Sequence, residues 1–71
     1  MTHIRMINAF QIRCIALDNK EAFISYGAGS VTLPKAVFDK YEPEIRKLIK
    51  KGGILTVDIH KDLIVSIDIS E

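Results

Sequence analysis

The chain has 71 residues, the length of one small domain and close to the lower limit for a fold that is stable without disulfides or a metal. Its composition, 48% hydrophobic and 27% charged, excludes a disordered chain, and its net charge of +1 excludes a strong global attraction to nucleic acid. The single cysteine, Cys14, excludes an internal disulfide and a zinc site built from cysteines. We therefore expect one domain over residues 1–71, with no cofactor and no metal.

Neither a membrane span nor an export signal is expected in this sequence. No apolar run reaches the roughly 20 residues that a membrane span requires. Arg5, Asn8, Gln11 and Arg13 interrupt the apolar segment that a signal peptide needs. A free thiol suits a reducing compartment, so a cytoplasmic protein without membrane contact is predicted.

Residues 4–26 are predicted to form a β-hairpin. In the first strand, residues 4–17, apolar side chains alternate with polar ones, which is the period of a strand with one buried face. The alternating apolar positions are Phe10, Ile12, Cys14 and Ala16. Turn-forming residues 18–21 and a second apolar run follow, while the register of the hairpin stays open.

A helical region is predicted after the extended segment Val31–Leu33. Pro34 suits the first position of a helix, and apolar side chains then recur every three or four residues as far as Ile49. Because Pro43 interrupts this pattern, two helical segments are expected along one line, about 34–41 and 43–51. The pair Gly52-Gly53 is expected to end the second segment.

Residues 55–69 are predicted to form a second hairpin. Apolar and polar side chains alternate on both sides of residues 60–62, and both apolar sets share a face only if these three residues form the loop. Asp62 is then expected in the left-handed conformation. The expected pairs are Leu55 with Ile67, Val57 with Val65, and Ile59 with Leu63.

The expected fold class is α+β, in the order β-β-α-β-β, with a small four-stranded, mostly antiparallel sheet and a kinked or broken helix on one face. The other face is not fully polar, and a chain this short usually buries such a face against a partner. A homodimer, or a complex with another protein, is therefore predicted. The expected interface residues are Ile15, Leu17, Ile64 and one of Phe23 or Ile24.

The sequence offers few catalytic groups. Cys14 lies among alternating core positions and is expected to be a small buried hydrophobe. His60, with Asp58 and Asp62 close by, is a weak pattern for a metal site, and no nucleophile elbow, phosphate-binding loop or dinucleotide fingerprint is present. We expect a non-enzymatic interaction or assembly module that works as a homo-oligomer, as in an accessory or structural protein of a phage or mobile element.

Residues 29–38, GSVTLPKAVF, resemble the opening of the AbrB/MazE-type swapped-hairpin transcription factors. Gly52-Gly53 and the hairpin over 54–69 match the second part of that family in outline, although the helical region is several residues longer here. The resemblance implies an interlocked dimer that grips DNA with basic side chains, with Lys35 as the residue carried over from the motif.

The charge distribution adds further basic candidates. Residues 34–53 hold six basic and three acidic side chains, whereas residues 54–71 hold one basic and four acidic ones. Cations at the end of a helix are favoured by the helix dipole, and they also suit a phosphate-binding surface. The alternative function is a small DNA-binding regulator. Its candidate contact residues are Arg5, Arg13, Lys35, Arg46, Lys47, Lys50 and Lys51.

Overall fold

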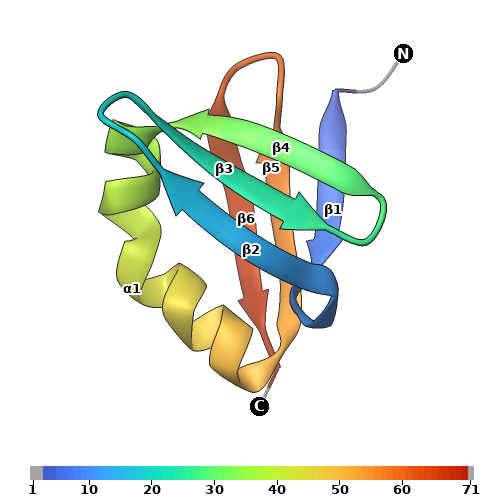
Figure 1. The fold of residues 1–71 in the computed structure, drawn as a ribbon. Coiled ribbons are helices and arrows are strands. Elements are labelled where there is room, and N and C mark those ends of the chain that lie inside the picture. The colour runs from blue at the N-terminus through green and yellow to red at the C-terminus, as the bar shows by residue number, and fades with distance from the viewer. Residues whose placement is uncertain (1–2, 71) are drawn as a thin grey trace.

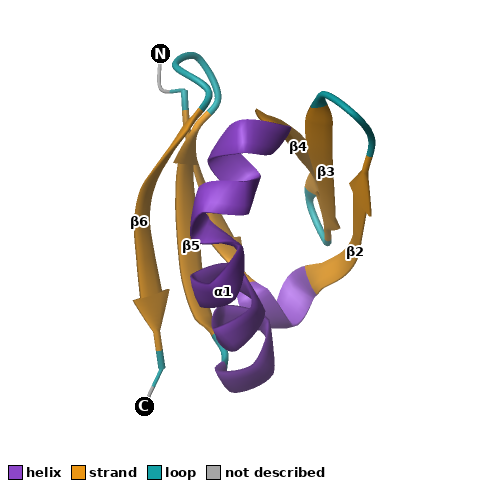
Figure 2. Ribbon diagram, turned by 90° about the vertical axis from the view of Figure 1, so that its left-hand side faces the viewer, coloured by secondary structure: helices purple, strands orange, loops and turns teal. Residues whose placement is uncertain are grey.

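In the computed structural model, which describes residues 3–70, two three-stranded antiparallel sheets face each other with one helix beside them (Figure 1). Sheet A has the order β1-β5-β6 and consists of β1 (Ile4–Asn8), β5 (Gly53–Asp58) and β6 (Leu63–Ile69). Sheet B has the order β2-β3-β4 and consists of β2 (Ile12–Leu17), β3 (Glu21–Tyr26) and β4 (Gly29–Pro34). The strands of sheet B cross those of sheet A, and helix α1 (Lys35–Lys51) stands between the sheets along one side (Figure 2).

The expected α+β class with one helical region is confirmed, but the expected four-stranded sheet in the order β-β-α-β-β is wrong. Residues 4–17 do not form one strand, because a 3-10 turn, η1 (Ala9–Gln11), divides them. Asn8 caps this turn: its side-chain oxygen accepts a hydrogen bond of 2.9 Å from the Phe10 N–H. Because the chain changes direction at this turn, β1 belongs to sheet A and β2 belongs to sheet B.

Strand β4 is the second difference in topology. The sequence indicated only that residues 31–33 are extended, yet the whole of β4 pairs with β3, from Gly29 opposite Tyr26 to Pro34 opposite Glu21. This pairing completes sheet B within residues 12–34, and the β2–β3 part of it corresponds to the predicted first hairpin.

The predicted second hairpin is present, with a changed register. Leu55 lies opposite Ile67 as predicted, and Asp62 has the expected positive φ of 55°. Between Thr56 and Val57 the register shifts by one residue, so Val57 lies opposite Ile64 and not opposite Val65. A bulge of this kind changes which side chains face the core. Val65 is accordingly 52% exposed, while Ile64 packs against the core.

Helix α1 is continuous through Pro43, so the expectation of two segments is wrong. A proline inside a helix removes one backbone hydrogen bond and costs about 3 kcal/mol. Phe38 lies before Pro43, whereas Ile45 and Leu48 lie after it, and all three side chains are buried. Both halves of the helix are therefore anchored in the core. The predicted helix end is confirmed, since the Gly52 N–H donates to the Leu48 carbonyl at 2.7 Å.

The core fills the space between the two sheets and the helix. One buried group joins both sheets to Leu48, and a smaller group joins Phe38 and Ile45 to Ala22. The half-buried Ile15 and Ile64 pack against both groups. Sheet A and sheet B thus cover each other, so much of the apolar surface that was predicted to face a partner is buried within the chain.

Two aspartates close the hairpin turns. Asp18 Oδ1 accepts hydrogen bonds of 2.7 Å from the backbone N–H groups of Lys20 and Glu21, and Asp58 Oδ1 accepts from those of His60 and Lys61 at 2.9 and 3.0 Å. The bonds from Lys20 and Glu21 lower the pKa of Asp18, and the bond from Lys61 is the main cause that lowers the pKa of Asp58.

The two turns make stability sensitive to acid. A carboxyl group whose pKa is lower in the folded than in the unfolded chain stabilises the fold above its unfolded value, about 4, and this contribution is lost as the pH falls through the lower folded pKa. We expect the melting temperature to fall below about pH 4, and the Asp18→Asn/Asp58→Asn variant to show a smaller fall. Melting curves recorded between pH 2 and pH 6 measure the fall in melting temperature of each protein. Glu44→Gln, a helix carboxylate outside both turns, is the control, and equal acid sensitivity of all three proteins would contradict the assignment.

Candidate interaction surface

The structure separates the expected interface residues into buried and accessible ones. Ile24 is fully buried between the sheets, where a partner does not reach it, and Ile15 and Ile64 are half-buried against the core. Leu17 is 45% exposed, and Phe23 is half-buried on the outer side of sheet B. Of the expected interface residues, Leu17 and Phe23 therefore remain the accessible apolar side chains. The side chain of Ile15 points from β2 toward the core.

The outer face of sheet B is uncharged across its middle. Successive side chains of a strand point to opposite faces, so the neighbours of the buried Ile24 and Val31 point outward. The register places the outward side chains in two rows. These rows, called here the outer face of sheet B, are Ala16–Phe23–Thr32 and Cys14–Ser25–Ser30. None of these six side chains carries a formal charge at pH 7, apart from any ionised Cys14 thiol, and Phe23 is the one aromatic ring among them.

Cys14 lies on this outer face and is exposed, so the expectation that it is buried is wrong. The reason is a register shift between Ile12 and Cys14, where Arg13 is the additional residue. After this additional residue, the inward-facing and outward-facing positions of β2 are exchanged, so that Ile15 faces the core and Cys14 faces outward.

Strand β2 has a free edge. The order β2-β3-β4 leaves one side of β2 without a neighbouring strand. Asp18 donates its N–H to the Glu21 carbonyl at 3.0 Å, and hydrogen-bonded pairs alternate along an antiparallel ladder. The backbone groups of Ala16 therefore face β3, whereas those of Ile15 and Leu17 point away from it. Within residues 3–70, no backbone group is bonded to Ile15 or Leu17 from that side.

The opposite edge of sheet B, strand β4, is closed to pairing at one end. The Lys35 N–H donates to the Lys20 carbonyl at 2.8 Å, so by the same alternation Thr32 and Pro34 direct their backbone outward. Pro34 has no N–H to offer, and prolines at sheet edges prevent further strands from adding. Strand β2 contains no proline. The edge of β2 therefore lacks the block that Pro34 places on the edge of β4.

The basic residues proposed to contact DNA do not lie together on one element of the structure. Arg5 and Arg13 lie on β1 and β2, and the other five lie on α1. At the start of the helix, Lys35 pairs with Asp39 at 2.8 Å, and one turn before the end, Arg46 pairs with Glu42 at 2.7 Å.

Three lysines remain as a basic patch at the end of the helix. Lys47, Lys50 and Lys51 are exposed, and none of them belongs to an ion pair within the described residues. Lys35 lies about 24 Å from Lys51 along the helix axis, since each residue rises 1.5 Å. The patch is thus Lys47, Lys50 and Lys51 without Lys35.

Several exposed apolar residues were not expected from the sequence. Phe10 is 78% exposed and Met6 is 69% exposed, although the alternation over residues 4–17 had included Phe10 in a buried set. Phe10 lies on the η1 corner, where its ring covers Gly52 at the end of the helix. The signal that was available is Asn8, a residue that favours turns and caps, in the middle of the apolar segment.

The described residues form no pocket and no cluster suited to a metal ion. Residues 3–70 contain no cluster of three His, Cys, Asp or Glu side chains arranged to hold a metal ion, and no pocket. The rings of His3 and His60 stack with their centroids 4.7 Å apart, while the Asp58 carboxylate is engaged by the turn. In the same part of the chain, no helix has the length and apolar character to cross a membrane.

The exposed surface therefore offers three kinds of feature. These are the uncharged outer face of sheet B, the free edge of β2 and the lysine patch at the end of α1. The AbrB/MazE resemblance of residues 29–69 stays a prediction. Comparison of the chain with protein-family models, with curated proteins and with solved structures finds no match.

Proposed function

We propose that the chain is a non-enzymatic interaction module that assembles as a homodimer. The observation that carries the proposal is the continuity of the outer face of sheet B with the free edge of β2. The free edge carries Leu17, which is exposed on the core side of β2, and the outer face carries the half-buried Phe23 and the small residues Cys14 and Ala16. A surface of low charge that ends at an unpaired strand is typical of protein–protein contact.

The magnitudes of burial and association set what a dimer requires. Association costs about 4–15 kcal/mol in lost freedom of movement, and full burial of one Leu or Phe side chain returns about 1.5–3 kcal/mol. A symmetric dimer buries each residue twice, so roughly two to four such residues per copy are needed. On β2 these residues are Leu17, which is 45% exposed, and the half-buried Ile15, and each returns only the share of this free energy that belongs to its exposed part.

Size-exclusion chromatography with light scattering tests the proposal. We expect a species of twice the 8.0 kDa chain mass, with dissociation on dilution. The Leu17→Lys variant should shift the equilibrium toward monomer, because it places a charge beside the unpaired edge. Leu63→Lys, which adds the same charge at a residue 38% exposed on sheet A, should leave it unchanged. A monomer at millimolar concentration would contradict the proposal.

The alternative proposal, a DNA-binding regulator, depends on the patch Lys47, Lys50 and Lys51. If each lysine contacts one phosphate, log K should fall with log salt at a slope of about −3, and the triple alanine variant should lose the binding. Gel shifts on a non-specific duplex at low and high salt measure this. No shift at low salt would end the alternative and leave the dimer proposal untouched.

A further inference from the structure

We propose that two copies of the chain pair through strand β2, antiparallel, around a two-fold axis at Ala16. The pairing joins the two copies of sheet B into one sheet in the order β4-β3-β2-β2-β3-β4. It rests on the proposed homodimer and specifies the strand and the register that form it.

The backbone of β2 is complementary to itself in this arrangement. Ile15 and Leu17 direct their N–H and C=O groups to the free edge, and placing Ala16 on the axis brings Ile15 opposite Leu17 of the second copy. Each of the two Ile15–Leu17 pairs exchanges two hydrogen bonds. This register uses the regular part of β2 and avoids the irregularity at Arg13.

The side chains suit the same register. Ile15 and Leu17 share the core side of β2, so each Leu17, 45% exposed in the single chain, gains contact with Ile15 of the second copy. On the outer side the two Ala16 side chains meet at the axis. Residues opposite each other without hydrogen bonds have the closest backbone approach, about 4.5 Å, and alanine fits there.

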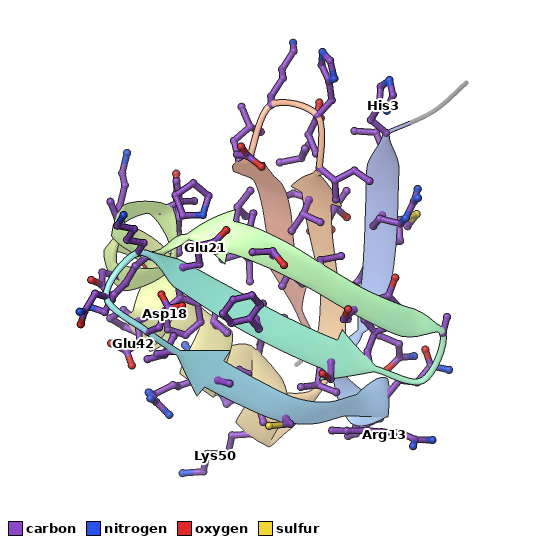
Figure 3. All side chains as sticks on the ribbon, turned by 45° about the horizontal axis from the view of Figure 1, so that its top comes forward. His3, Arg13, Asp18, Glu21, Glu42 and Lys50 are labelled. Atoms are coloured by element: carbon purple, nitrogen blue, oxygen red, sulfur yellow. The ribbon has the colours of Figure 1, made fainter. Side chains whose placement is uncertain are left out.

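The charges at the two ends of β2 favour the antiparallel direction. Arg13 lies at the start of β2 and Asp18 directly after its end, and Figure 3 shows them at opposite ends of the strand, with Glu21 on the Asp18 side. Lys20 lies in the turn, so Asp18, Lys20 and Glu21 together carry one negative charge. A two-fold axis at Ala16 brings the Arg13 end of one copy beside the Asp18 end of the other. A parallel arrangement would place like charges together.

A disulfide between the two copies tests the register. In the Cys14→Ser/Ala16→Cys variant the only cysteine lies on the proposed axis, at a separation within the 4.4–6.8 Å between Cα atoms that disulfides span. We expect mild oxidation to convert it to a covalent dimer, seen on a non-reducing gel as a doubling of the 8.0 kDa mass. The unmodified chain should not cross-link efficiently, because two Cys14 residues lie roughly 14 Å apart in this register.

The control places a cysteine at the other edge of the same face. Cys14→Ser/Ser30→Cys carries an exposed cysteine on β4 and should cross-link only slowly, through random collision. If light scattering shows a dimer but Cys14→Ser/Ala16→Cys cross-links no faster than this control, the pairing through Ala16 is refuted and the homodimer stands. If the unmodified chain is a monomer, the proposed function itself fails.

Discussion

A Gly53→Ala variant should lose about 3–5 kcal/mol of stability, which combines a backbone conformation closed to alanine with a clash inside sheet A. Gly53 has a φ of 135°, which side chains with a Cβ rarely adopt. A Cβ at this position would overlap the carbonyl oxygen of Asp68 and lie 2.8 Å from Leu48 Cδ1. Because Asp68 belongs to the neighbouring strand β6, relieving the clash requires β6 to move away from the first residue of β5.

Urea unfolding followed by circular dichroism measures this loss, with Gly27→Ala as the matched control. A Cβ at Gly27 meets only ordinary contacts of 3.7 Å with Gln11. The control should stay within about 0.5 kcal/mol of the unmodified chain. If the two alanine variants unfold at the same urea concentration, the role assigned to Gly53 is wrong.

Phe38→Ala should be the most damaging change in the helix, at about 3–5 kcal/mol. Phe38 is 1% exposed, and it forms the smaller buried group with Ala22 and Ile45. A domain of this size has roughly 4–10 kcal/mol of total stability. The cavity therefore removes a large part of what holds α1 against the two sheets, and we expect a much lower melting temperature.

Ile49→Ala separates core packing from helix propensity. Ile49 lies on the same helix and is 38% exposed, and alanine has the higher helix propensity. We expect a change smaller than about 1 kcal/mol at this position. A thermal melt in which Phe38→Ala and Ile49→Ala behave alike would show that α1 is not anchored through Phe38.

The features that the sequence predicted correctly are local ones. The helix end at Gly52 and the left-handed Asp62 follow from the conformational preferences of the residues themselves. The pairing of Leu55 with Ile67 was also predicted, whereas the predicted pairs closer to the turn, Val57 with Val65 and Ile59 with Leu63, are wrong because of the bulge between Thr56 and Val57. The helix end and the left-handed Asp62 depend on residues within a few positions of one another, so one sequence is enough to infer these two features.

The two-sheet arrangement depends on interactions that alternation does not encode. The apolar pattern runs through residues 4–17, and only the cap at Asn8 divides it into β1 and β2. The bulge at Arg13 then reverses which side chains of β2 face the core. For this reason Ile15 was expected on an uncovered face, and the free edge of β2 was not foreseen. The helix stayed whole because burial on both sides of Pro43 outweighs a local penalty.

The pairing of β1 with β5 has a consequence for how the protein is made. Strands β2, β3 and β4 are consecutive, so they are able to associate as soon as residue 34 has left the ribosome, whereas Ile4 must wait for Asp58. Until then the nascent chain carries an N-terminal strand without a neighbour and leaves Ile7 unprotected. Chaperone capture during synthesis should therefore be strongest for chains stalled before Gly53 and should decline once β5 has emerged.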